Sequence, residues 1–166
     1  MAEPAVDPNR EAVERADAVL RATIEPVIDD PTVFVKGAAL GTLTTIELAK
    51  LAPVKSQDGA IRAFAEALRR NQEALRKELT AIAGRKRLDV TGSLIHQDEA
   101  MLEEGASRGG APFDAWFVLQ ANDELLKSVA LFEAASRMKD RELAAFATKS
   151  LPVLENDRKA LTALVR

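Results

Sequence analysis

The clearest pattern of hydrophobic and polar positions lies in residues 61–82. Apolar residues recur there at spacings of three and four, which is the period of one face of an α-helix. They are Ile61, Phe64, Ala65, Leu68, Leu75, Leu79 and Ile82. Gln72 is a polar position on this face, and the opposite face is charged. The pattern predicts a long amphipathic helix over residues 58–83, whose apolar face other helices must cover.

A second long helix is expected over residues 31–52. Asp30 suits the N-cap position and Pro31 the first helical position. Thr45 interrupts the apolar face of this helix, and Pro53 is expected to stop it. The short connection to the next helix predicts an antiparallel hairpin, and Gly84 is expected to end the hairpin's second helix.

Two more long helices are expected over residues 112–138 and 141–165. Asp157 lies on the otherwise apolar face of the last one, and Pro152 predicts a kink near Thr148. Residues 10–27 suit a short outer helix, and residues 94–104 suit a short crossover helix. Residues 1–9 are expected to be disordered, and residues 10–166 to form a single domain.

A faint internal repeat relates the two halves of the chain. The face running from Phe64 to Ile82 matches the face from Phe146 to Leu164 at a constant offset. Two helical hairpins joined by a long crossover are typical of ferritin-like folds. The predicted fold class is therefore all-α: a ferritin-like antiparallel four-helix bundle with an extra N-terminal helix and a short crossover helix.

Composition agrees with close-packed helices. Hydrophobic residues make up 47% of the 166 residues but aromatic residues only 4%, whereas strands draw on aromatic and β-branched residues. No stretch is long and apolar enough for a membrane span. The net charge of −3 gives no general attraction to nucleic acid, and the lack of cysteine excludes disulfides and thiolate chemistry.

Basic residues concentrate in residues 60–87. This run has two interpretations: a solvated helix face that ends favourably for the helix dipole, or a surface that binds anionic partners. The candidate basic surface consists of Arg69, Arg70, Arg76, Arg85, Lys86 and Arg87.

Several short blocks resemble a known bacterial family. They include Phe34-Val35-Lys36-Gly37-Ala38-Ala39, Ile46-Glu47-Leu48-Ala49-Lys50-Leu51-Ala52, Ala130-Leu131-Phe132-Glu133 and the segment from Phe146 to Leu154. Their order and spacing resemble the domain of unknown function 4142 family. The resemblance implies a ferritin-like four-helix core and export from the cytoplasm, and it implies no established reaction.

The chain departs from that family at four aligned positions. Where relatives carry core histidines, this chain has Gln72, Leu125 and Asp157, and where they carry a glutamate it has Thr45. Three of these positions also interrupt the apolar faces described above. The candidate polar core cluster is therefore Thr45, Gln72 and Asp157, expected to point inward.

The inventory of chemical groups is small. There is no Glu-x-x-His motif, and the one histidine, His96, is expected to be an exposed residue of the crossover segment, so di-iron chemistry and other cofactors are not expected. The polar core cluster is either a hydrogen-bonded structural group or an oxygen site for a hard cation. The aromatic residues near Trp116 are expected to fill the core, and Glu47 with Lys50 to pair at the surface.

These observations predict a non-enzymatic exported protein that works by binding. The expected partner is another protein or further copies of this chain, without nucleic acid. The alternative is a degenerate metal-binding protein that stores or senses a cation through Asp157. The polar, Pro-containing residues 1–8 are typical of the start of a mature periplasmic protein, and a cytoplasmic location is the alternative.

Overall fold

The computed structural model describes residues 8–23, 29–90 and 94–165, with the backbone alone at residue 8 and over residues 17–23. These residues form six helices and no strand, which confirms the predicted all-α class. The helices are α1 (Pro8–Thr23), α2 (Pro31–Lys55), α3 (Gly59–Arg85), α4 (His96–Ala106), α5 (Gly110–Ala135) and α6 (Arg141–Ala163).

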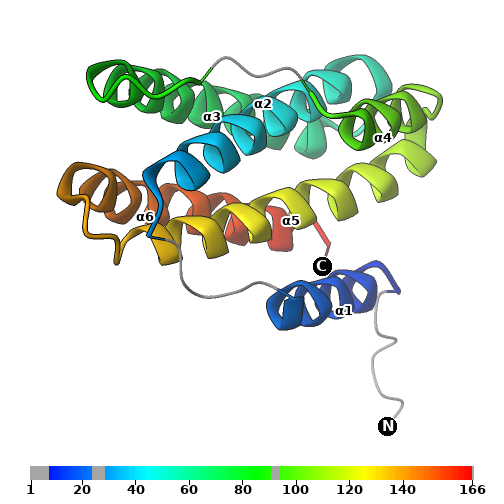
Figure 1. Cartoon of the computed structure of the whole chain (residues 1–166). Helices are drawn as coiled ribbons and strands as arrows, with labels where there is room; N and C mark the ends of the chain where they lie inside the picture. Colours follow the sequence, from blue (N-terminus) through cyan, green and yellow to red (C-terminus); the bar gives the residue numbers. More distant parts are fainter. Residues whose placement is uncertain (1–7, 24–28, 91–93, 166) are drawn as a thin grey trace, which may run out of the picture.

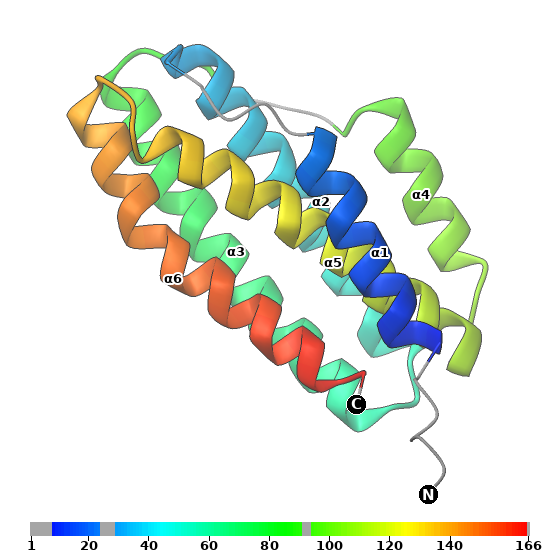
Figure 2. The same cartoon turned by 90° about the horizontal axis from the view of Figure 1, so that it is seen from below.

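The four long helices pack as two antiparallel hairpins. One hairpin is α2 with α3, the other is α5 with α6, and the two layers meet through α2 against α5 and α3 against α6 (Figure 1). The long connection after α3 contains α4, which packs across α2 and α5. Helix α1 lies against α5 on the outside of the molecule (Figure 2).

Aspartate side chains begin three of the four long helices. Asp30 Oδ1 accepts from the N–H of Thr32 at 2.9 Å, and Asp58 Oδ1 accepts from the N–H of Ala60 at 2.8 Å. Asp140 Oδ1 accepts from the N–H of Leu143 at 3.1 Å. Each carboxylate satisfies a donor that the first helical turn leaves free, so these predicted helix starts are confirmed.

Two predicted helix ends are wrong. Helix α2 passes Pro53 and ends at Lys55, because proline lacks only its own N–H and the N–H of Ser56 still donates to the Ala52 carbonyl at 2.9 Å. Helix α3 continues past Gly84. Its left-handed closing residue is Arg87, with φ of 56°, and the N–H of Leu88 donates back to the Ala83 carbonyl at 2.8 Å.

The other boundaries shift by a few residues. Helix α1 begins at Pro8, α4 includes Gly105, and α5 begins at Gly110. The predicted disorder of residues 1–9 is wrong for Pro8 and Asn9, which are helical, and residues 1–7 lie outside the described residues. The expected continuation of this helix to residue 27 also lies outside them. At Gly105, the Trp116 ring occupies the space where a side chain would lie, so this position inside α4 has room only for glycine.

The core runs along the centre of the four long helices. At one end Phe34, Phe132 and Phe146 meet, with the Phe34 and Phe132 rings edge to face at 5.2 Å. At the other end Phe113 stacks on Phe117 at 5.7 Å. Between these aromatic groups lie buried leucines and alanines, including Leu125, and a layer of polar side chains.

Candidate functional sites: a buried polar layer and a pocket

Thr45, Gln72 and Asp157 are all buried, so the inward direction predicted for the polar core cluster is confirmed. The register of α2 and α3 places the first two at one level. Arg76 on α3 donates to the Ala39 carbonyl on α2 at 2.6 Å, and Thr45 and Gln72 both lie further toward the hairpin turn. Asp157 joins this level from α6, where it meets Asn71.

The hydrogen bonds of this layer are incomplete. The Thr45 hydroxyl donates to the Gly41 carbonyl at 2.8 Å, and Asn71 Nδ2 donates to Asp157 Oδ1 at 2.9 Å. Within the described part of the chain, Asp157 Oδ2 and both amide atoms of Gln72 have no hydrogen-bond partner. Buried polar groups normally have partners, so these three atoms are available to one.

Burial also changes the acidity of Asp157. Loss of solvent raises the pKa of its carboxyl to about 6 from an ordinary 3.8, and the hydrogen bond from Asn71 offsets only part of that rise. The described residues contain no group of three or more histidine, cysteine, aspartate or glutamate side chains placed to hold a metal. Any cation in this layer would therefore rely on one carboxylate with neutral oxygens.

The residues of the candidate basic surface are largely engaged in hydrogen bonds. Arg69 forms ion pairs with Glu66 and Glu73, at 2.5 Å and 2.8 Å. Arg76 donates to the Ala39 carbonyl and thereby ties α3 to α2. These contacts support the interpretation of a solvated helix face.

The basic end of α3 is tied to the start of α6. Arg85 pairs with Glu142, and Lys86 Nζ lies 2.9 Å from Asp140 Oδ2. Burial acts to raise the pKa of Asp140, but Lys86 and the N–H of Leu143 outweigh it, so the pKa is lowered. This cluster fastens the first hairpin to the second.

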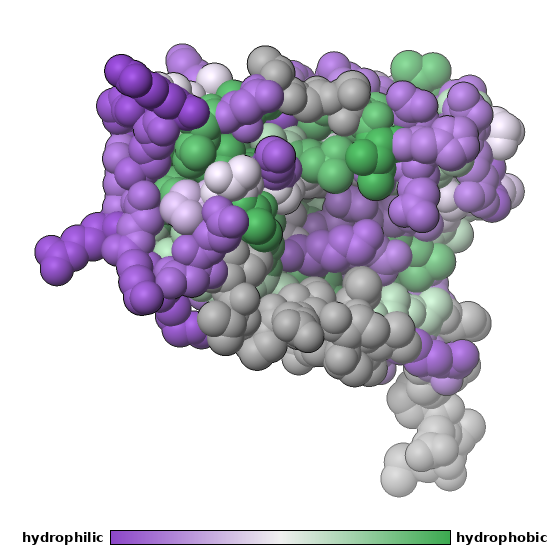
Figure 3. Space-filling view, in the orientation of Figure 1, coloured by the Kyte–Doolittle hydropathy of each residue, from purple (hydrophilic) through white to green (hydrophobic). Residues whose placement is uncertain are grey.

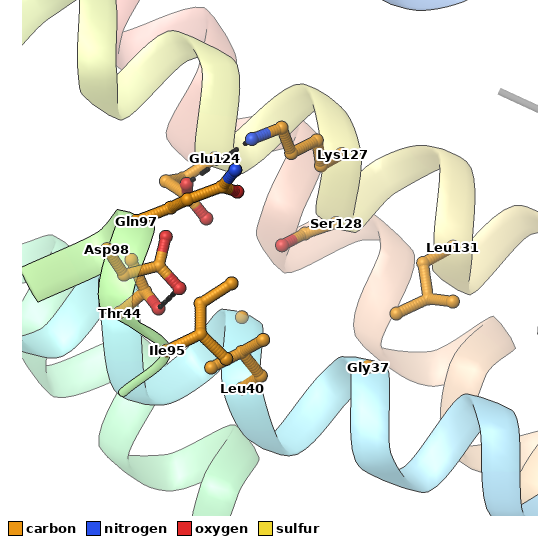
Figure 4. A pocket seen from close by; sticks show the side chains of 11 residues that line it. Gly37, Leu40, Thr44, Ile95, Gln97, Asp98, Glu124, Lys127, Ser128 and Leu131 are labelled. Carbon is orange, nitrogen blue, oxygen red and sulfur yellow. Dashed lines mark hydrogen bonds and ion pairs between the residues drawn. The ribbon is translucent and has the colours of Figure 1, made fainter. Parts of the chain in front are cut away.

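A pocket that sequence reasoning missed lies between α2, α4 and α5. Its volume is about 210 Å³. Figure 3 shows that hydrophilic and hydrophobic residues adjoin on the face of the molecule seen in Figure 1. Figure 4 shows side chains from all three helices turned toward it. Its polar groups include Thr44, Asp98, Glu124, Lys127 and Ser128.

Glu124 is the central acidic group of this pocket. Only 9% of the residue is exposed, and its nearest cation is the half-exposed ammonium of Lys127, 3.6 Å away. Burial raises the pKa of the Glu124 carboxyl; Lys127 acts against that rise and the charge of Asp98 adds to it. Asp98 Oδ2 in turn accepts a hydrogen bond from the Thr44 hydroxyl at 3.3 Å.

Ser128 presents a further polar group to the pocket. The residue is 8% exposed, and its oxygen is directed into the pocket (Figure 4). A sequence signal for the site existed. Glu124 and Ser128 are spaced by four on one helix, and that spacing puts them on one face.

The remaining sequence candidates have simple positions. His96 is exposed at the first turn of α4, as expected. Trp116 is buried against Phe113 and Gly105, and it forms part of the core. Lys50 Nζ lies 2.8 Å from Glu47 Oε1 at the surface, which confirms that predicted pair.

Among the described helices, none combines the length and apolar character needed to cross a membrane. No curated protein matches the chain, and no solved structure does. A model of the family described as Domain of unknown function (DUF4142) matches residues 18–164. That range includes the four long helices, the buried polar layer and the pocket, and the chain belongs to this family.

Proposed function

We propose that this chain is a non-catalytic binding protein built on a ferritin-like four-helix bundle. The packing order of α2, α3, α6 and α5 supports the bundle, because each long helix contacts two others. The two antiparallel hairpins and the long connection through α4 match the arrangement with one long crossover. Ligand sites in such bundles are formed by side chains of facing helices.

The observation that carries the binding function is the pocket around Glu124. A carboxylate taken out of water destabilises a protein unless partners compensate, and here the ion partner is a lysine at the solvent edge. The pocket has room for several non-hydrogen atoms, since a cavity of roughly 150 Å³ accepts a benzene ring. A small ligand in this pocket supplies the missing compensation.

A protein partner has less support on the surface. Among the described residues, the large apolar side chains that are exposed lie apart: Val33 is in the first turn of α2, Val54 is in its last turn, and Ile95 precedes α4. Among these three, Ile95 also lines the pocket. The proposal therefore favours a small ligand over a second protein or a second copy of the chain.

A screen of small polar fragments by ¹H–¹⁵N NMR tests this function. Compounds that bind should shift amide signals of α2, α4 and α5 around Glu124, and Gly41→Ala should weaken their binding, because its methyl group takes up space beside Ser128. Glu133→Gln, an exposed change on α5, the helix that carries Glu124, is the control. Shifts confined to other surfaces, or none at all, would contradict the proposal.

We also propose that the protein acts in the periplasm. The resemblance of its sequence blocks to an exported family supports this location. Fractionation of the native host, with an antibody against this chain, tests it. Recovery with cytoplasmic markers would favour the alternative location.

A second candidate function is cation binding by the buried polar layer. It is supported by the unpartnered atoms Gln72 Oε1 and Asp157 Oδ2. Elemental analysis of protein purified without chelators should then find one metal per chain, and Asp157→Asn should remove it. Ser150→Ala alters a buried hydroxyl on the same helix that already bonds to the Phe146 carbonyl, so it should retain the metal. A metal-free wild-type protein would remove this candidate.

A further inference from the structure

The walls of the pocket between α2, α4 and α5 differ in character. One part is acidic, with the carboxylates of Glu124 and Asp98, and beside it Ser128 presents a hydroxyl, which can accept or donate a hydrogen bond. The other part is apolar, with Leu40, Ile95 and Leu131. Figure 4 shows the polar and apolar side chains on separate sides of the space between the helices.

The balance of charge in the pocket favours a cationic head group. Two carboxylates and one ammonium line the pocket. The ammonium is that of Lys127, which pairs with Glu124 and whose side chain is 55% exposed. A lysine at the solvent edge can turn outward, because its long side chain keeps its charge hydrated there. A ligand ammonium could then take its place between the two carboxylates without leaving a buried cation unpaired.

The size and the apolar wall favour an organic cation over a metal ion. The volume of about 210 Å³ exceeds that of a single ion, and hard divalent cations require about six oxygen ligands. The described residues place no third acidic side chain or histidine with Glu124 and Asp98. A short aliphatic chain, by contrast, would lose water against the leucine and isoleucine side chains.

We propose that this pocket binds a primary ammonium group carried on a short aliphatic chain, with Glu124 and Asp98 accepting from the ammonium. The Ser128 hydroxyl completes the set of acceptors, and the aliphatic part lies against Leu40 and Ile95. This assignment of a ligand class rests on the proposed binding function. It is independent of the buried polar layer around Asp157.

Titration calorimetry and NMR with n-butylamine at neutral pH test the proposal, with n-butanol, butyrate and calcium chloride as comparison compounds. We expect one butylamine site and weaker binding of the other three compounds. Glu124→Gln should weaken butylamine binding about tenfold or more, because hydrogen bonds to a charged group are among the stronger ones. Lys127→Gln should strengthen it, since the competing cation is gone.

Gly41→Ala separates binding from folding. A Cβ atom at residue 41 would meet the Ser128 hydroxyl oxygen at 3.7 Å, an ordinary contact, so the variant should fold. Alanine also favours the helix over glycine, so its stability should be equal or higher. The added methyl group beside Ser128 should nevertheless weaken butylamine binding, whereas Glu133→Gln should leave it unchanged.

The outcomes distinguish the ligand class from the function. Butanol or butyrate binding as well as butylamine would overturn the ammonium assignment while leaving a small-ligand pocket in place. Calcium displacing butylamine with the same dependence on Glu124 would overturn it in favour of a hard-cation site. No binding of any fragment or probe to the wild-type pocket would overturn both the assignment and the proposed function.

Discussion

At the scale of single residues, Asp157 shows how a buried carboxyl group makes stability depend on pH. Its pKa is about 6 in the folded protein and near 3.8 when solvated, so the folded state holds the proton more tightly. The resulting stabilisation is fully present below about pH 4 and is lost as the pH rises through 6. The protein therefore carries a charge-burial penalty from Asp157 at neutral pH.

Asp157→Asn should remove that penalty. We expect its free energy of unfolding at pH 7.5 to exceed that of the wild type by up to about 3 kcal/mol, because the shift corresponds to two pKa units. The difference should shrink to near zero at pH 4. Urea unfolding at both pH values measures it, with Ser150→Ala as a control whose effect should not vary with pH. If the wild-type protein were more stable than Asp157→Asn at pH 7.5, the buried charge of Asp157 would not destabilise the fold, and the prediction would be wrong.

Among the described glycines, Gly105 is the one where packing leaves least space for a side chain. A Cβ atom there would overlap the Trp116 ring, with ring atom Cζ2 at only 2.8 Å. Gly105→Ala should push α4 away from α5 and lower the free energy of unfolding by about 1–3 kcal/mol, as overpacking does.

The single tryptophan makes this effect visible by fluorescence. Gly105→Ala should shift the Trp116 emission to longer wavelength, because the ring gains contact with water. Gly84→Ala has nothing within 4 Å of the added carbon and should leave the emission unchanged. Identical spectra for Gly105→Ala and the wild type would show that α4 does not close over the ring.

At the scale of elements, helix starts were easier to predict from sequence than helix ends. Asp30, Asp58 and Asp140 carry their own capping oxygen, so the chemistry that starts each helix is visible in the residue type. The ends depend on backbone hydrogen bonds that many residues can form. Gly84 suggested an end to α3, but the left-handed position fell three residues later, on Arg87.

Arg87→Gly should stabilise the end of α3. A residue with a side chain is strained at a φ of 56°, and glycine there should raise the free energy of unfolding by up to about 1 kcal/mol. Arg87→Ala removes the same charge but keeps the Cβ atom, so it is the control. Denaturant unfolding of both variants measures the difference. Equal stabilities would mean that the backbone at residue 87 is not strained.

At the scale of the whole molecule, periodicity predicted the all-α class and the inward direction of Thr45, Gln72 and Asp157, because both follow from position along a helix. The pocket was beyond this reasoning. Asp98 lies on α4 and Glu124 on α5. They line the same pocket only because α4 packs across α2 and α5. Tertiary placement of a short helix is not encoded in its own periodicity.

The outer position of α1 leads to a last prediction, that residues 29–166 fold without it. Among the described side chains of α1, Val13 belongs to the core, and the ion pairs of Arg10 with Glu14 and of Arg15 with Glu11 lie within the helix and are exposed. The helix packs against α5. The contacts among α2, α3, α5 and α6 do not involve it. A chain beginning at Asp29 also keeps the hydrogen bond from the Lys139 N–H to the Asp29 carboxylate.

We expect this shortened chain to unfold in one cooperative transition. Its helical circular dichroism signal should be lower than that of the full chain only by the contribution of the residues of α1. The midpoint temperature should fall modestly, because the side of α5 that α1 covers becomes exposed to water. Val13→Asp in the full chain is the matched variant, since a buried charge should release α1 while leaving its residues present. A broad, non-cooperative transition in both proteins would mean that α1 is required to complete the core, and α1 would then belong to the folding unit itself.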